Sequence, residues 1–373
     1  MSTFFSKHNL IKPLARKPLA FSIATLCCSG FTGPLSAGTF ETGIVSTYQA
    51  STDDRSESEF STSLDVVFSS QLGPGELQVH IEASTTPRNG GVGSLVPDAN
   101  ADLGSALGGN GDGRVQISEL TYNWSNSHAS YTLGLIDATG FMDSSAVAND
   151  EGAQFLAGPL VNNPTIQFPD YSLGGVVGYQ RKPDHPHLHL ILTNSHGLGD
   201  NPKASYSELV DLNDTPKGIF LGAELEWEGT TSYRVGTWTN TAYNANLSGV
   251  GGGTNYGVYG VIDNTKDQTH WTVRAGMANE KVSQTAWFLS SAIDHEFTSF
   301  RAGLGIALSA ASDKLAASAD HSIVSELYSS HKLGAAMHIS PHIQYHKNPG
   351  FDSSNTTTDD SQWIGGVRLS IAF

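Results

Sequence analysis

The chain has 373 residues, of which 40 are glycines and 15% are charged, and its 36 acids against 20 lysines and arginines give a net charge of −16 at neutral pH. This acid excess argues against nucleic acid as a partner, because a phosphate backbone requires clustered cations. Many glycines and few charges are typical of strands joined by tight turns and long polar loops.

Residues 1–37 have the pattern of a secretory signal peptide. A basic stretch precedes an apolar core at 18–28, and a small-residue cleavage site follows at 35–37. Cleavage after Ala37 would remove four cations and leave a mature chain with 16 lysines and arginines against 36 acids, a net charge of −20. Cys27 and Cys28 are the only cysteines, so the mature chain has no thiol chemistry. Leu26 before Cys27 argues against a lipoprotein.

Residues 38–373 form one domain of predicted strands, because apolar residues recur there with a period of two. No segment after the signal peptide approaches the roughly 20 apolar residues of a transmembrane helix. The last segment alternates strictly and ends on Phe373, an aromatic terminus that resembles the signal recognised in bacterial outer-membrane barrels. The sixteen predicted strands are 39–50, 57–70, 76–84, 114–124, 129–137, 172–182, 187–195, 219–227, 232–240, 255–263, 269–278, 284–293, 299–309, 321–329, 336–347 and 362–373. Weak patterns at 39–50 and 321–329 leave 14 or 18 strands open.

The connections between these strands sort by parity. Short connections follow even-numbered strands, and the long ones at 85–113, 138–171, 196–218, 241–254, 310–320 and 348–361 all follow odd-numbered strands. Outer-membrane barrels show this sorting, whereas a soluble β-sandwich has no reason to. The sequence therefore predicts an all-β fold, a transmembrane antiparallel β-barrel of 16 strands. Its lumen would be wide enough for water.

The polar faces of the predicted strands would line that lumen. They carry charges of both signs, while the opposite faces are almost bare of charge, as lipid on one side requires. The inward residues are Gln78, His80, Glu82, Glu224, Glu226, Arg234, Trp238, His270, Arg274, Arg301, His342, Gln344, His346 and Arg368.

The connection at 138–171 differs from a polar external loop. It contains apolar side chains that need a surface to pack on, and the inner wall of a wide barrel is the nearest one. They include Phe141, Met142, Phe155, Leu156, Leu160, Val161, Ile166 and Phe168. We expect this connection to fold inward as a constriction loop that narrows the pore.

Several motifs resemble the carbohydrate-selective porin family, the OprB type. They are GRVQISEL at 113–120, GLID at 134–137, NDE at 149–151, QF at 154–155, NNPTI at 162–166, FPD at 168–170, PHIQY at 341–345, NPG at 348–350 and RLSIAF at 368–373. The similarity extends from about residue 60 to the end. It implies a channel in the outer membrane of a Gram-negative bacterium that passes small sugars by passive diffusion, with one pore per chain and a homotrimer allowed. The chain is short for the family and strongly acidic, which leaves a general or cation-preferring diffusion porin as the alternative.

Candidate solute-binding residues follow from the chemistry of sugars. Sugars offer hydroxyls for hydrogen bonds and C–H faces for stacking, so carboxylates, amides, guanidinium groups and aromatic rings suit a constriction. Binding must stay weak for flux. The candidates on the loop are Asp150, Glu151, Gln154, Asn162 and Asn163, and those on the wall are Arg114, Glu119, Trp124, Arg234, Trp238, Arg274 and Arg368. In the alternative, the loop residues only form hydrogen bonds that hold the loop to the wall.

Three other signals carry less weight. Residues 108–119 resemble the calcium-binding loop of an EF-hand. The first position, normally aspartate, is Gly108, and a strand follows where the EF-hand requires a helix. Asp98 and Asp102 could bind calcium in a looser arrangement. His185, His187 and His189 have a spacing that suits zinc or copper, but Pro186 interrupts them, so no metal is predicted.

Common hydrolase and nucleotide-binding motifs were not found, and we expect neither enzyme activity nor a cofactor. A secreted β-rich surface protein is a third interpretation.

Overall fold

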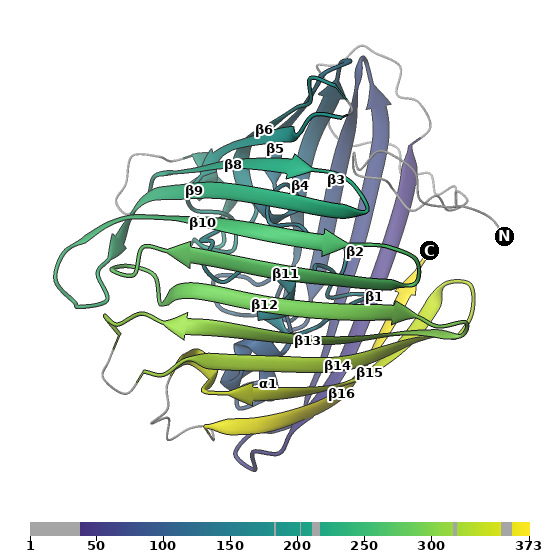
Figure 1. Ribbon diagram of the computed structural model, residues 1–373, viewed down its shortest axis with the longest axis vertical. Coiled ribbons are helices and arrows are strands. Elements are labelled where there is room, and N and C mark those ends of the chain that lie inside the picture. The colour runs from purple at the N-terminus through teal and green to yellow at the C-terminus, as the bar shows by residue number, and fades with distance from the viewer. Residues whose placement is uncertain (1–37, 183, 202, 211–216, 316–318, 352–359) are drawn as a thin grey trace.

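The computed structural model describes residues 38–182, 184–201, 203–210, 217–315, 319–351 and 360–373. The predicted signal peptide at 1–37 lies outside these residues. Sixteen strands form one closed antiparallel barrel in which β1 pairs with β16 (Figure 1), which confirms the predicted fold and strand number. The strands are β1 (Thr39–Ser51), β2 (Glu59–Leu72), β3 (Gly75–Ser84), β4 (Val115–Ser125), β5 (Ala129–Ile136), β6 (Ser172–Tyr179), β7 (His187–Asn194), β8 (Ile219–Trp227), β9 (Thr231–Ala245), β10 (Gly252–Asn264), β11 (Thr269–Ala278), β12 (Thr285–Glu296), β13 (Phe300–Ala311), β14 (Ser322–Lys332), β15 (Met337–Lys347) and β16 (Ser361–Ala372).

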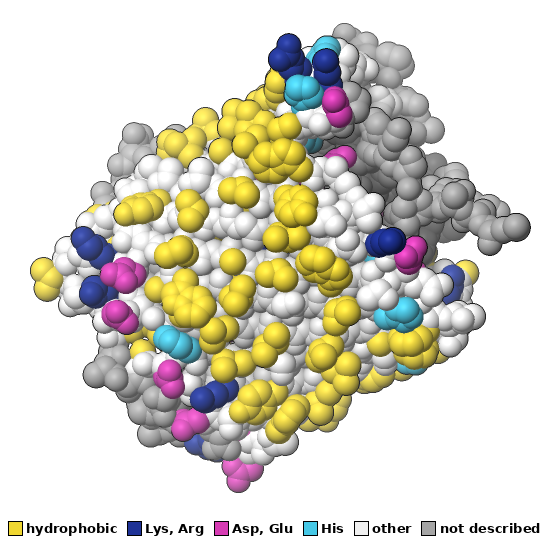
Figure 2. Space-filling view, in the orientation of Figure 1, with side chains coloured by type: hydrophobic (Ala, Val, Ile, Leu, Met, Phe, Trp, Pro, Cys, Tyr) yellow, Lys and Arg dark blue, Asp and Glu magenta, His cyan; other side chains and the backbone are white. Residues whose placement is uncertain are grey.

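The two faces of the sheet differ in chemistry, as the period of two predicts. Large apolar side chains are exposed on the outer face, among them Leu190, Leu225, Val258, Leu289, Leu304 and Leu327. Figure 2 shows such side chains spread over the strands, with charged groups gathered toward the strand ends. The alternate positions are buried and largely polar, including Thr193, Glu224, Asp263, Arg274 and Glu326. This pattern is that of a barrel with lipid outside and polar groups inside.

A bulge in β4 changes which side chains of that strand face inward. The pairing with β3 shifts between His80 and Ile81, so that Glu119 lies opposite His80 and Ile117 opposite Ile81. The extra residue is Ser118, and beyond a bulge the alternation of faces is displaced by one position. Trp124 then shares its face with Leu120, which is 46% exposed on the outside.

The long connections all leave the same end of the barrel. The connections 85–114, 137–171, 195–218, 312–321 and 348–360 follow odd-numbered strands, while the turns after β2, β4, β8, β10, β12 and β14 are short. These turns lie at the opposite end of the barrel, which we call the short-turn end. Among the described residues, no helix is long and apolar enough to cross a membrane.

The connection between β5 and β6 packs on the inner face of the barrel. It contains η2 (Ala138–Gly140) and α2 (Gly158–Val161). We call residues 138–171 the lumen segment. Val147, Ala148, Phe155, Ala157 and Leu160 form one apolar cluster with side chains of β12, β13 and β14. Met142 and Ile166 join a second cluster with side chains of β6 to β10. The apolar residues of this connection therefore do find their packing surface on the wall, over β6 to β14.

A second connection also packs inside, which the sequence analysis did not anticipate. The connection between β3 and β4 contains α1 (Val92–Leu95) and η1 (Pro97–Ala99), and Val92, Val96 and Ala99 pack on Ile364 of β16. The Ala99 carbonyl accepts hydrogen bonds from Gln49 and Gln344, each 3.0 Å long. The Ala101 amide donates to the Leu156 carbonyl at 2.8 Å. This upper segment, residues 92–106, therefore binds both the wall and the lumen segment. The remaining 3₁₀ turns are η3 (Tyr206–Val210) and η4 (Pro349–Phe351).

Candidate functional site

Arg274 of β11 binds the lumen segment from one side of the barrel. Its guanidinium donates to the carbonyl oxygens of Asp143, Ala148 and Val161, at 3.0, 2.9 and 3.0 Å. The residue is 1% exposed. A buried guanidinium with three carbonyl acceptors has little capacity left for a solute. Arg274 therefore anchors the lumen segment to β11.

Residues of β14 and β16 bind the same segment from the other side. Arg368 donates to the carbonyl oxygens of Glu151 and Gln154, the latter at 2.9 Å, and is 2% exposed. The Glu326 carboxylate accepts from the Leu156 and Ala157 amides, at 3.0 and 2.7 Å. Arg368 is thus a second anchor. The lumen segment is bound to β11, β14 and β16, so it extends across part of the barrel interior.

Arg234 and Trp238 of β9 also lie on the inner wall. Arg234 pairs with Asp263 at 2.6 Å and with Glu226 at 2.5 Å, and Asp263 in turn accepts from the Ser145 hydroxyl at 2.8 Å. Trp238 is 2% exposed and stacks on Phe220, with 6.2 Å between ring centroids. Both predicted wall residues are buried in contacts within the protein.

The predicted residues of the lumen segment divide into two groups. Gln154 accepts from the Asn149 and Asp150 amides, at 2.9 and 3.2 Å, and the Asn163 side chain accepts from the Thr165 amide at 3.0 Å, so both stabilise local turns. Asp150 and Asn162 are exposed, and Glu151 is partly exposed. Burial and, after it, the neighbouring Asp150 raise the pKa of Glu151 to about 7. Asp150, Glu151 and Asn162 are the members of the predicted set on this segment that keep exposed surface.

The wall formed by β2, β3 and β4 is acidic. His80 is hydrogen-bonded to Asp65 at 3.0 Å and to Glu119 at 3.3 Å, and the Asp65 side chain is 37% exposed. Asp102 of the upper segment accepts from the Ser63 hydroxyl at 2.9 Å, and burial raises the pKa of its carboxyl to about 6. Asp65 was not among the predicted lumen residues, although its alternation with Ser61 and Ser63 marks the polar face of β2.

Two other predicted wall residues lie away from this group. Arg114 donates to Gln116 at 2.9 Å and to the Ala204 carbonyl, so it binds the connection that follows β7. Trp124 stacks on Tyr131, with 5.1 Å between ring centroids, and shares the outer face with Leu120 and Leu133. The bulge at Ser118 thus directs Trp124 outward, into a group of aromatic rings typical of a membrane interface.

No family model matches this chain. An uncharacterized protein of Aquifex aeolicus (strain VF5) is 38% identical over 65 residues, which are 17% of this chain and 21% of that protein. The fold comparison is more extensive. OprB of Pseudomonas putida, in a structure determined at high pH, superposes with a TM-score of 0.68 over 90% of this chain and 94% of OprB, at 11% identity.

The fold is that of an outer-membrane porin. The outer-membrane channel DcaP of Acinetobacter baumannii matches with a TM-score of 0.55 over 90% of this chain and 97% of DcaP, at 11% identity. A mutant of the Rh. blastica porin matches with a TM-score of 0.53 over 90% of this chain and all of that chain, at 12% identity. The resemblance to the carbohydrate-selective porin is thus present in the fold, and the architecture is that of a channel.

The lumen of the barrel holds a polar cavity at the short-turn end. This vestibule has a volume of about 540 Å³ and is lined by parts of β3 to β9 and by the start of the lumen segment. Its lining includes carboxylates, amides, imidazoles, a guanidinium and aromatic residues: Glu76, Gln78, Asn123, Trp124, Tyr131, Phe141, His187, His189, Glu224, Glu226 and Arg234.

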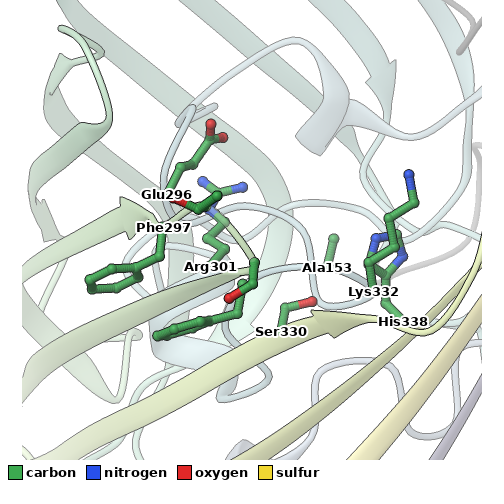
Figure 3. A pocket seen from close by; sticks show the side chains of 10 residues that line it. Ala153, Glu296, Phe297, Arg301, Ser330, Lys332 and His338 are labelled. Atoms are coloured by element: carbon green, nitrogen blue, oxygen red, sulfur yellow. The ribbon is translucent and has the colours of Figure 1, made fainter.

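A second cavity lies on the other side of the barrel at the same end. It also measures about 540 Å³ and is lined by Ala153 of the lumen segment and by residues near the turns after β12 and β14. Figure 3 shows Glu296 and Arg301 on one side of it and Lys332 and His338 on the other. The lumen segment contributes residues to both cavities.

Proposed function

We propose that this chain is a channel in the outer membrane of a Gram-negative bacterium for the passive diffusion of carbohydrates. The observation that carries the proposal is the vestibule, in which amides such as Gln78 and Asn123 lie with carboxylates and the ring of Phe141 around one cavity. This combination meets the hydroxyls and C–H faces of a sugar. The higher TM-score with OprB than with DcaP or the Rh. blastica porin also supports it.

The lumen segment would act as the constriction. It is anchored at Arg274 and Arg368, and it leaves Asp150, Glu151 and Asn162 accessible between those anchors. A solute moving along the lumen would meet these polar groups in sequence, and weak contacts of this kind allow release as well as entry. Transport would follow the concentration gradient and would require no cofactor.

A specific observation favours the alternative, a cation-preferring diffusion porin. The inner cations Arg234, Arg274 and Arg368 are buried in ion pairs or carbonyl contacts, whereas Asp65 and Asp150 are open to the lumen. A lumen lined by accessible carboxylates raises the local concentration of cations. Sugar passage and cation preference can coexist, because a neutral sugar does not respond to this field.

Single-channel recordings in planar bilayers separate the two functions. Sugar-dependent block of the ion current supports the carbohydrate channel, whereas strong cation selectivity without block supports the general porin. Liposome swelling with monosaccharides and disaccharides then ranks the solutes. Asn162→Ala should weaken sugar block several-fold, and Asn110→Ala is the matched control because Asn110 is an exposed amide of the connection between β3 and β4.

The oligomeric state is part of the same proposal. A homotrimer would place three such pores side by side in the outer-membrane lipid. Sedimentation of the detergent-solubilised protein tests this, with a mass of three chains as the expected result and a single-chain mass as the contrary one.

A further inference from the structure

Three side chains that bind metals well in other proteins converge in the vestibule. His187 and His189 lie on the inner face of β7, because Leu190 and Leu192, which follow them at the alternate positions of the strand, are exposed on the outer face. Glu226 of β8 lies directly opposite His187 in the register. One donor atom from each of the three residues lies within 4.8 Å of the other two. His185, which precedes them in the sequence, lies in the turn before β7 and is not part of this group.

Neighbouring residues orient the group. One oxygen of the Glu226 carboxylate pairs with Arg234 at 2.5 Å, while the other lies 3.7 Å from Nε2 of His189. Arg234 is itself paired with Asp263 at 2.6 Å, so its charge is balanced. Outer partners of this kind orient the ligands of a metal and support its binding.

Space for the His187 ring comes from a glycine on the neighbouring strand. A Cβ at Gly178 of β6 would lie 2.8 Å from Nε2 of His187. The His187 and His189 rings lie 4.1 Å apart between centroids, tilted at 44°. The absence of a side chain at Gly178 therefore lets the two imidazoles lie close together.

We propose that His187, His189 and Glu226 form a binding site for a divalent transition metal, with Zn²⁺ as the ion that fits its donors best. Two imidazoles and a carboxylate are the donor set of open zinc sites, in which water or another ligand completes the coordination. Zinc lies about 2.1 Å from such donors, which brings tetrahedral ligands to about 3.4 Å from each other. Rotation of partly exposed side chains can close the present separations to that value.

The vestibule makes this site accessible to ions from the short-turn end. Both histidines and Glu226 line the cavity, so water can occupy the open positions on the metal. The second group of this kind, Asp65 with His80 and Glu82, offers a single imidazole, and both nitrogens of His80 are already bonded to carboxylates. A bound Zn²⁺ would add positive charge at the mouth of an acidic lumen, and the cation current should fall.

Zinc titration of the folded, tag-free protein in detergent tests the site, because a histidine tag would itself bind the metal. Isothermal titration calorimetry should give one Zn²⁺ per chain, and Co²⁺ should give the visible absorption of a tetrahedral site. His187→Gln with His189→Gln should weaken binding by at least about 100-fold. His185→Gln is the matched control and should bind as the parent does. A heat-modifiable band on a gel verifies that each variant is folded.

Two results would overturn the proposal. One is the absence of saturable binding to the folded parent protein. The other is retention of full affinity by the double variant, which would place the zinc elsewhere. Neither result depends on whether the channel passes sugars, so the metal site and the proposed function are tested separately.

Discussion

Removal of the Arg274 guanidinium tests the anchoring of the lumen segment. Arg274→Met keeps much of the side-chain volume but removes the donors to Asp143, Ala148 and Val161. A hydrogen bond to a charged group contributes about 1.5–3 kcal/mol. Because the three bonds share one desolvated group, we expect a net loss of about 3–5 kcal/mol, as for one partner of a buried ion pair. At about 1.4 kcal/mol per factor of ten, release of the segment becomes more favourable by roughly two to three and a half orders of magnitude.

The assay for this change is single-channel conductance together with liposome swelling. A released segment should widen the passage, so Arg274→Met should conduct more ions and admit larger sugars than the parent. Arg301→Met is the control, because Arg301 pairs with Asp294 of the adjacent strand rather than with the segment. A folded Arg274→Met barrel with unchanged conductance and unchanged solute size would refute the anchoring role.

Two further predictions concern packing and charge in the lumen. A Cβ at Gly305 would lie 2.8 Å from Leu160 and 3.0 Å from Phe155, so Gly305→Leu should displace the lumen segment and raise the single-channel conductance. Gly365→Leu is the control and should leave the conductance unchanged, because a Cβ at Gly365 would meet open space. With its pKa raised to about 7, Glu151 is charged at pH 8 and neutral at pH 5, so cation selectivity measured from reversal potentials should fall over this range. Glu151→Gln should lose the part of the pH dependence of cation selectivity that lies near pH 7. An undiminished pH dependence in that variant would contradict the role of Glu151.

The strand pattern was predictable because it is local. Lipid and lumen impose a period of two on every strand, and the parity of loop lengths adds a second signal. The face of Trp124 was not predictable, because one extra residue at Ser118 reverses the alternation without leaving a clear mark in the sequence. The upper segment was missed for a different reason. Its apolar residues Val92, Val96 and Ala99 have helical spacing, which is a usable signal, but short helices inside the long connection at 85–113 were not expected.

The roles of the inner arginines could not be deduced from residue type. Guanidinium groups suit sugar hydroxyls and backbone carbonyls equally well. The choice depends on the path of the lumen segment, which brings carbonyls of residues distant in sequence to Arg274 and Arg368. The partners of these arginines lie more than a hundred residues away, and no local pattern encodes such contacts.

The most direct test of this account is a cross-link between the lumen segment and the wall. A Cβ at Gly152 would lie 3.7 Å from Cγ2 of Val45 on β1, and a cysteine Sγ at position 45 can occupy the place of that Cγ2, so cysteines at the two positions are close enough to react. The mature chain is predicted to have no cysteines, so the Val45→Cys, Gly152→Cys double variant can be oxidised without competing thiols. The account predicts that a disulfide forms within one folded barrel. Two thiols that stay free in a folded barrel under the same oxidation would contradict it.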